Sequence, residues 1–311
     1  MLLQSDSSGL GIWGVGVAIA GGALRGSIPY MFVSLGECLT EKSGKINLGM
    51  EGVLLMGAMT AFAVSDLTGS PWLGVLAAAM VGLLLGGLHA WLTQQPAVND
   101  VAAGIAMIVF GSGLAFFFGK RFVAPMAPQL PLVNLGGWSN TPAVQSALRI
   151  SPLFFIGIGA GFFLHWVFTQ TRWGLQIRAA GDDPQAARAL GISVNTVRFV
   201  AIMAGGALAA VGGAHLTLYF PGIWSEGISG GQGLMAVALV IFAKWSPRRC
   251  LAAALLFGGA QALGPSLQSL GINGFYYIFN ASPYLLTLAV MVATCSPNRS
   301  LAGMPGALGR K

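Results

Sequence analysis

The chain has 311 residues, of which 55% are hydrophobic and only 8% are charged. Soluble domains carry about 25% charged residues and need a wetted exterior, for which 16 basic and 9 acidic residues are too few. The composition therefore excludes an ordinary water-soluble globule and predicts a surface that faces lipid.

The formal net charge of +7 raises the alternative of nucleic-acid binding, because clustered Lys and Arg neutralise phosphates. The basic residues instead occupy short stretches between apolar runs, which is the placement expected of a membrane protein. The sequence therefore predicts no nucleic-acid partner. Its three cysteines have no CxxC spacing and indicate neither a disulfide framework nor a metal site.

Apolar windows of about 20 residues predict membrane-spanning helices. The first stretch, residues 10–35, is interrupted by Arg25 and Pro29 and predicts either one tilted span or two short segments. Regular windows follow at residues 46–65, 71–92, 101–119, 152–168, 200–220, 251–270 and 275–294. Residues 227–243 are glycine-rich and of marginal length for a span. We therefore expect an all-α, polytopic bundle of about nine or ten membrane segments, forming a single domain over residues 1–311.

Basic residues predict the orientation of these spans, since cytoplasmic loops carry an excess of Lys and Arg. Alternate threading places one group on the same side: Lys42, Lys45, Arg172, Arg178, Arg188, Arg198, Lys244, Arg248, Arg249, Arg299, Arg310 and Lys311. Only Lys120, Arg121 and Arg149 fall on the other side. This split predicts a cytoplasmic C-terminus, an external loop at 120–149 and a cytoplasmic loop at 172–198.

The cytoplasmic loop contains signals for a short, well-delimited helix. Asp183 is a good N-cap, Pro184 suits the first helical position, and Gly191 fits just past the end. A helix of about two turns is marginal in water by itself, so we expect it to dock on another protein. A simple capped connector is the alternative.

The same loop resembles the coupling segment of bacterial ABC importer permeases, in the family that handles simple sugars, nucleosides and branched-chain amino acids. The resemblance continues in order along the chain, at Gly36-Glu37, Lys42 to Gly52, Val98 to Ile105, Ala236 to Leu239, Trp245-Ser-Pro247, Leu256-Phe-Gly258 and Pro283 to Leu286. The segment from Gly36 to Gly52 is most similar to the nucleoside and simple-sugar branch.

This resemblance implies a type II importer permease fold in a bacterial cytoplasmic membrane. It implies three protein partners: an ABC ATPase subunit that holds ATP and Mg, a second and related permease subunit, and an extracytoplasmic substrate-binding protein. The residues implied to contact the ATPase are Arg178, Asp183, Pro184, Ala187, Arg188 and Gly191.

The chain itself lacks a phosphate-binding loop. Ser43-Gly44-Lys45 is followed by Ile46, and the glycine-rich run from Gly227 to Gly233 has no Lys to reach a phosphate. We therefore expect a transport subunit that is not an enzyme, has no catalytic residues and binds no cofactor.

Polar residues near the spans are candidates for the substrate pathway, because an amide or carboxylate can hydrogen-bond a polyhydroxylated or heterocyclic solute. The candidates are Asn47, Glu51, Asn99 and Gln232, with Gln261 and Gln268 as further uncharged groups. Glu51 also lies near a helix N-terminus, where free N–H groups favour a negative charge, so a structural role is an equal alternative.

Two other classes of protein remain as alternatives. An ion-coupled secondary transporter would bury a charged site at mid-membrane, where the predicted spans are almost free of charge. A membrane-embedded enzyme would need a nucleophile with its base, or a metal cluster, and the sequence shows neither.

Overall fold

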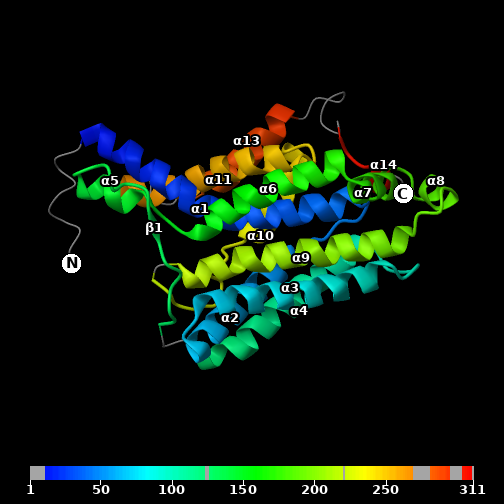
Figure 1. Cartoon of the computed structure of the whole chain (residues 1–311), viewed down its shortest axis with the longest axis horizontal. Coiled ribbons are helices and arrows are strands. Elements are labelled where there is room, and N and C mark those ends of the chain that lie inside the picture. The colour runs from blue at the N-terminus through cyan, green and yellow to red at the C-terminus, as the bar shows by residue number, and fades with distance from the viewer. Residues whose placement is uncertain (1–10, 123–125, 220, 269–280, 295–302, 310–311) are drawn as a thin grey trace.

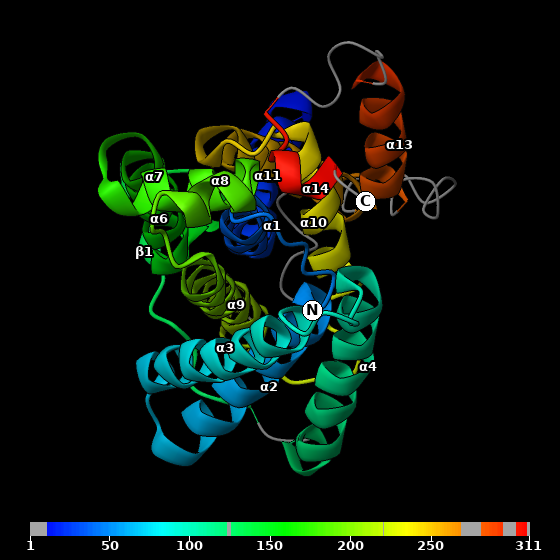
Figure 2. The ribbon, with the colours of Figure 1, turned by 90° about the vertical axis from the view of Figure 1, so that its right-hand side faces the viewer.

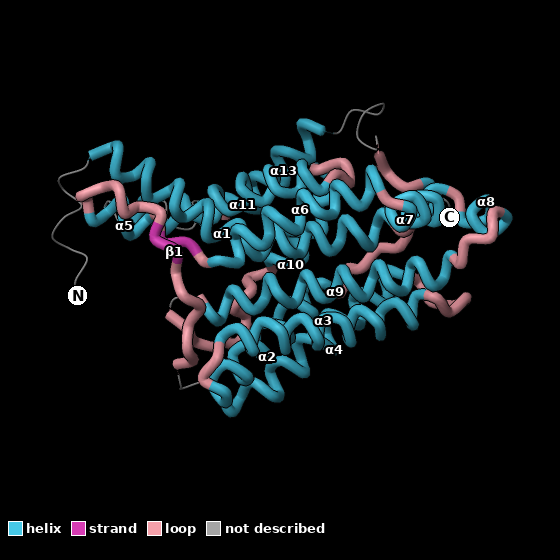
Figure 3. The backbone as a smooth tube through the Cα atoms, viewed as in Figure 1, coloured by secondary structure: helices cyan, strands magenta, loops and turns pink. Residues whose placement is uncertain are grey.

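The structure is a computed structural model that describes residues 11–122, 126–219, 221–268, 281–294 and 303–309. Its long helices are α1 (Gly11–Lys42), α2 (Met50–Thr68), α3 (Pro71–Thr93), α4 (Asp100–Gly119), α6 (Pro152–Gln170), α9 (Val194–Leu218) and α11 (Pro247–Gln268). The shorter helices are α5 (Pro142–Ala147), α7 (Arg172–Asp182), α8 (Pro184–Ala189), α10 (Gln232–Phe242), α13 (Ser282–Thr294) and α14 (Gly306–Gly309). A 3₁₀ turn, η2, covers Lys120–Phe122, and strands β1 (Val133–Asn134) and β2 (Arg149–Ile150) pair antiparallel. The regular secondary structure of the described chain is thus helical except for this one short ribbon (Figure 3), which confirms the all-α prediction.

Six of the described helices are long and apolar enough to cross a membrane: α2, α3, α4 with η2, α6, α9 and α11. Each coincides with a window that the sequence predicts, and the boundaries differ by a few residues. In the last predicted window, 275–294, residues 275–280 lie outside the described part, and α13 begins at Ser282. The finding supports a multi-pass membrane protein.

Helix α1 decides between the two interpretations of the first apolar stretch. It is a single helix of 32 residues that continues through Arg25 and Pro29, corresponding to a length of about 48 Å. Its second half is buried among α6, α9, α10 and α11. Packing from all sides compensates for the backbone hydrogen bond that Pro29 removes, so the helix is not divided in two.

The glycine-rich stretch 227–243 does not form a full span. Only α10 is helical there, with 11 residues, or about 16 Å, roughly half the hydrocarbon thickness. Gly227, Gly230 and Gly231 precede it with positive φ angles, a conformation that ends regular helix and that glycine adopts without steric cost. The prediction of a marginal span at 227–243 is therefore corrected to a half-helix preceded by a turn.

The helices form two groups joined by α9. Figure 2 shows α2, α3 and α4 on one side of α9, with α1, α6 and α11 on the other, and α9 contacts α1, α2 and α3. Small residues allow this close packing: a Cβ added at Gly57 would lie 2.5 Å from the Cα of Ala210 on α9. The absence of a side chain at Gly57 therefore allows α2 and α9 to approach closely.

The basic residues separate to opposite ends of the bundle. Helices α7, α8 and α14 lie at one end of the long axis, and α5 and β1 lie at the other (Figure 1). At the first end, Lys42, Arg178, Lys244 and Arg249 line one pocket, and η2 and β2 carry the basic residues of the opposite group. Arg299, Arg310 and Lys311, which the sequence assigns to the first side, lie outside the described residues.

Candidate functional site

A cavity of about 210 Å³ lies where four helices converge. Its lining comes from α1, the C-terminal end of α9, the first residue of α10, and α11, and consists of Arg25, Gly26, Pro29, His215, Leu216, Tyr219, Gln232 and Gln261. Ligand sites are typically cavities of this kind, with a few polar groups converging on an otherwise apolar wall.

The polar groups of this cavity have unused hydrogen-bonding capacity. Gln232 Oε1, Gln261 Oε1 and His215 Nδ1 are buried and have no hydrogen-bond partner among the described residues. Arg25 Nη1 donates to the hydroxyl of Tyr219 at 3.4 Å, and the rings of Tyr219 and His215 lie 5.0 Å apart. Buried polar atoms are nearly always paired, so these three atoms make the cavity a candidate solute site.

Glu51 positions one wall of the cavity. Its carboxylate is buried on α2 and accepts hydrogen bonds from Ser229 Oγ at 2.5 Å, Gly233 N at 2.7 Å and Leu234 N at 3.3 Å. These groups belong to the turn before α10 and to its first residues, where unpaired N–H groups favour an anion. Glu51 therefore fixes the start of α10, which carries Gln232 into the cavity.

The two asparagines of the predicted pathway lie elsewhere. Asn99 caps α4 and accepts hydrogen bonds from Val101 N at 2.8 Å and Ala102 N at 3.2 Å. Asn47 lies in the turn between α1 and α2, where its Oδ1 accepts from Gly49 N at 2.9 Å and its backbone N–H donates to Glu37 at 2.8 Å. Of the four predicted pathway residues, only Gln232 lines this cavity, and Glu51 contacts it indirectly through α10.

Three residues of the cavity were missed by sequence reasoning: Arg25, His215 and Tyr219. Arg25 carried a usable signal, since it is the one charge within the first apolar stretch, and ionisable residues inside membrane segments mark functional sites. His215 and Tyr219 are four residues apart near the end of α9 and meet Arg25 only through the packing of α1 on α9.

The second candidate surface is the short helix α8 at the end of the bundle. Asp183 caps it as predicted, accepting from Gln185 N at 3.0 Å and Ala186 N at 3.1 Å, Pro184 takes the first position, and Gly191 follows with a φ of 80°. The helix thus forms where the sequence predicts it. Its contact with an ATPase stays a prediction.

The predicted coupling residues do not all share one face. Ala187 is buried beneath α8, while Arg188 and Arg178 are exposed. Sequence reasoning overlooked Leu190, which is 79% exposed just after α8. Leu190 and Arg188 are therefore both accessible to a partner at this end of the bundle.

Arg198 connects the coupling loop to the bundle. From the first turn of α9, its Nε donates to Ser43 O at 2.9 Å and its Nη2 donates to Ala180 O at 3.1 Å. Beside it, Lys45 Nζ forms an ion pair with Asp100 at 2.8 Å. The end of α7 is thereby joined to the turn that follows α1, the helix that lines the cavity with Arg25.

The chain matches the family model described as "Branched-chain amino acid transport system / permease component" over residues 19–295. The chain belongs to this family of permeases. It is 35% identical, over 84% of its length and 86% of the relative, to TsgC13 of Haloferax volcanii, whose name assigns it to glucose ABC transport. It is 30% identical to the nucleoside ABC transporter permease NupC of Lactococcus lactis, over 85% of this chain and 88% of NupC. NupB of the same organism, also a nucleoside ABC transporter permease, is 26% identical over 78% of this chain and 71% of NupB.

Family membership confirms the prediction of a multi-pass permease component that carries no ATPase site of its own. Among solved structures, the permease is similar to PsaBC of Streptococcus pneumoniae in complex with Fab, with a TM-score of 0.46, 15% identity, and coverage of 94% and 95% of the two chains. No group of metal-ligating side chains occurs within the part of the chain that the structure describes.

Proposed function

We propose that this permease is the transmembrane subunit of an ATP-driven ABC importer for nucleosides or simple sugars. The observation that carries the proposal is the family match over residues 19–295, together with relatives named as glucose and nucleoside ABC transporter permeases. The same relatives favour ATP-driven transport over the ion-coupled alternative.

The cavity supports the same class of solute. Two amide oxygens, a histidine nitrogen and the Arg25–Tyr219 pair offer acceptors and donors from several directions, as a polyhydroxylated solute requires. The free-energy cost of removing a solute's hydroxyl groups from water is offset only when each hydroxyl forms a hydrogen bond in the site. The cavity lining provides hydrogen-bonding partners for them. A purely apolar solute would leave these groups unpaired.

The partners follow from the same assignment. An ATPase subunit, holding ATP and Mg, docks on α8, where Arg188 and Leu190 are exposed, and an extracytoplasmic binding protein delivers solute at the end that carries α5. NupB and NupC are two relatives from one organism, which supports a heterodimer with a second, related permease. This arrangement places α7, α8 and the C-terminus in the cytoplasm of a bacterial cell, in agreement with the excess of basic residues there.

A mechanical connection joins the ATPase-docking helix α8 to the solute cavity. Movement of α8 by the ATPase is transmitted through α7 and the Arg198 hydrogen bonds to the turn after α1. Helix α1 carries Arg25 and Pro29 into the cavity, so a shift of α1 changes the shape of the solute site. This is the contact by which ATP binding drives alternating access.

Uptake by cells that express the complete transporter tests the proposal. The assay compares a panel of labelled nucleosides, bases, pentoses and hexoses, with and without a proton ionophore, and after ATP depletion. We expect uptake of nucleosides, pentoses or hexoses that persists with the ionophore and stops without ATP. Uptake that stops with the ionophore while ATP is maintained contradicts the proposal.

A point variant tests the cavity separately. Gln261→Ala removes one unpartnered acceptor and is expected to raise the KM of uptake by about fivefold, the equivalent of about one hydrogen bond of about 1 kcal/mol. Gln95→Ala, at an exposed position after α3, is the matched control. Equal KM values for the two variants contradict the assignment of the cavity.

A further inference from the structure

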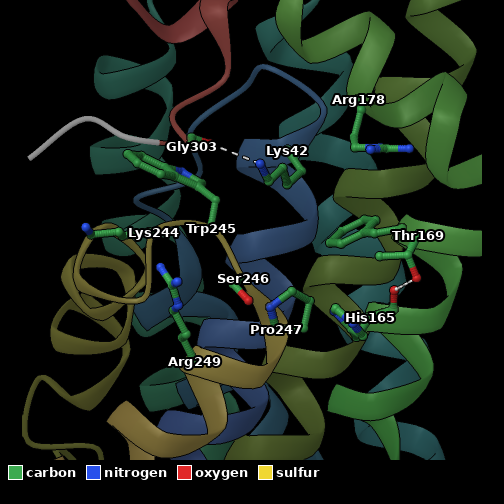
Figure 4. A pocket seen from close by; sticks show the side chains of 11 residues that line it. Lys42, His165, Thr169, Arg178, Lys244, Trp245, Ser246, Pro247, Arg249 and Gly303 are labelled. Atoms are coloured by element: carbon green, nitrogen blue, oxygen red, sulfur yellow. Dashed lines mark hydrogen bonds between the residues drawn. The ribbon is translucent and has the colours of Figure 1, made fainter. Parts of the chain in front are cut away.

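A second cavity, of about 460 Å³, lies at the end of the bundle that carries α7. It is lined by Lys42 at the end of α1, Arg178 on α7, Lys244 after α10 and Arg249 on α11, together with His165, Phe168 and Thr169 of α6. Figure 4 shows the four basic side chains around the pocket, contributed by four different helices or their ends, with Lys244 and Arg178 extending towards opposite sides. The candidate coupling helix α8 does not line it, whereas Arg178, one of the residues predicted to contact the ATPase, does.

The charged side chains that line this pocket, among the described residues, are all basic. No Asp or Glu is among the described residues that line it, and the one ion pair found in the described chain, Lys45–Asp100, lies elsewhere. Lys42 interacts electrostatically with Arg178, of like charge, and with Asp182, which lies outside the lining. Lys42 Nζ also donates to Gly303 O at 3.0 Å. Like charges near one another destabilise a fold, so four basic side chains with only Asp182 and Glu41 nearby favour a bound anion.

The backbone is strained at Lys244 and Trp245, two neighbouring residues that both line the pocket. Lys244 and Trp245 both have a φ of 52°, and they are the non-glycine residues with positive φ in the part that the structure describes. Such residues cost of order 1–3 kcal/mol each and gather at binding sites. The indole N–H of Trp245 is fixed by the carboxylate of Glu41, which holds this strained turn against α1.

The pocket lies at the depth of lipid headgroups. Trp166 and Trp173 are 53% and 51% exposed on α6 and α7, on either side of the lining residue Thr169, and exposed tryptophans mark the boundary between membrane and water. Towards the middle of the bundle, Phe162 is 53% exposed and Leu256 is 52% exposed. These two residues continue the same faces of α6 and α11 with apolar surface.

We propose that this pocket binds the phosphate of an anionic phospholipid, whose acyl chains lie along the exposed faces of α6 and α11. Basic pockets between membrane helices recognise anionic headgroups in this way. Arg249 and Arg178 provide paired N–H donors for phosphate oxygens, and Lys42 and Lys244 add point charges. Arg248, whose guanidinium lies 5.8 Å from the ring centroid of Phe162, covers the apolar edge of the site.

Lipid retention tests the proposal on the full-length permease in detergent. Phosphatidylglycerol is titrated against a background of phosphatidylcholine, and bound lipid is counted by native mass spectrometry. Lys244→Gln with Arg249→Gln is expected to weaken phosphatidylglycerol binding about thirtyfold, which corresponds to about 1 kcal/mol for each basic residue near the surface. The matched control is Lys120→Gln with Arg121→Gln, two exposed basic residues at the opposite end, and we expect it to bind as the wild type does. Equal binding by both double variants overturns the proposal.

A second measurement separates the sources of the anion and does not depend on the double variant folding. Ser246→Cys, in a background with Cys295→Ser, places a thiol on the pocket lining, while Cys38 and Cys250 are buried. We expect phosphatidylglycerol vesicles to slow labelling of this thiol by a water-soluble maleimide, and phosphatidylcholine vesicles and inorganic phosphate to leave it unchanged. Protection by inorganic phosphate alone assigns the site to a free anion and overturns the lipid. Protection only when the ATPase subunit is present assigns it to a protein interface, and likewise overturns the proposal.

Discussion

Replacing Glu51 tests whether the start of α10 depends on a buried carboxylate. Glu51 is only 7% exposed and accepts hydrogen bonds from Ser229, Gly233 and Leu234. Glu51→Ala removes all three and leaves two backbone N–H groups of α10 unpaired. Side-chain hydrogen bonds in membrane proteins average about 0.6 kcal/mol and reach about 1.7 kcal/mol, so the free energy of unfolding falls by about 2 kcal/mol, with an upper value of about 5 kcal/mol.

Glu51→Gln removes the negative charge of the side chain and keeps nearly the same shape. The amide keeps one acceptor oxygen, so we expect a loss of about 1 kcal/mol, roughly half that of Glu51→Ala. The midpoint of thermal unfolding of the purified permease should therefore fall in the order wild type, Glu51→Gln, Glu51→Ala. The KM of uptake rises in the same order, because Gln232 loses its fixed position in the cavity.

Glu226→Gln is the matched control, since Glu226 is exposed in the turn before α10 and the change in charge is the same. We expect its unfolding midpoint and uptake to match those of the wild type. If Glu51→Gln raises KM while its unfolding midpoint stays at the wild-type value, Glu51 contacts solute directly and the reasoning is refuted.

Three further predictions concern the coupling helix and helix packing. Leu190→Asp, at a residue that is 79% exposed, should abolish ATP-driven uptake while gel filtration shows that the permease is still folded. Met126→Asp, at a residue that is 72% exposed in the loop at the opposite end, should preserve uptake. Loss of uptake in both variants contradicts the docking surface. Asp183→Ala removes the cap of α8 and costs about 1 kcal/mol of local helix stability, so less ATPase subunit should co-purify with the permease. Asp183→Ser, which keeps a capping oxygen, should restore co-purification of the ATPase. No recovery with Ser contradicts a capping role for Asp183. Gly258→Val would place a Cβ 2.5 Å from Ala23 O and Ser27 N and should destabilise the fold by about 1–3 kcal/mol. Gly159→Val, where a Cβ would have nothing within 4 Å, should leave the midpoint of thermal unfolding unchanged. Equal midpoints for the two variants refute the close contact of α1 with α11.

Features that depend on local sequence were predictable. Apolar windows bounded by Pro, Gly or charge gave α2, α3, α4, α6, α9 and α11, because the bilayer requires about 20 apolar residues whatever lies beside them. The capped helix α8 was predictable for a similar reason, since Asp183, Pro184 and Gly191 act within their own turns of backbone.

Features that depend on neighbours were not predictable. Glu51 and Asn99 have the same appearance in the sequence, as polar residues at the start of a span, yet Asn99 caps its own helix and Glu51 binds the start of α10. Likewise, the continuity of α1 through Pro29 depends on the helices that surround it.

The sequence by itself determined that this protein lies in a membrane, where its spans run, which loops carry its charge and which family it resembles. These properties follow from short-range hydropathy, capping and the order of motifs. The tertiary structure alone decided that Arg25, His215, Gln232 and Gln261 share one cavity, and that Lys42, Arg178, Lys244 and Arg249 share another. The physical reason is that each cavity is assembled from helices far apart in the chain, and in lipid their contacts depend on the fit of small residues and polar groups rather than on a hydrophobic pattern along any one helix.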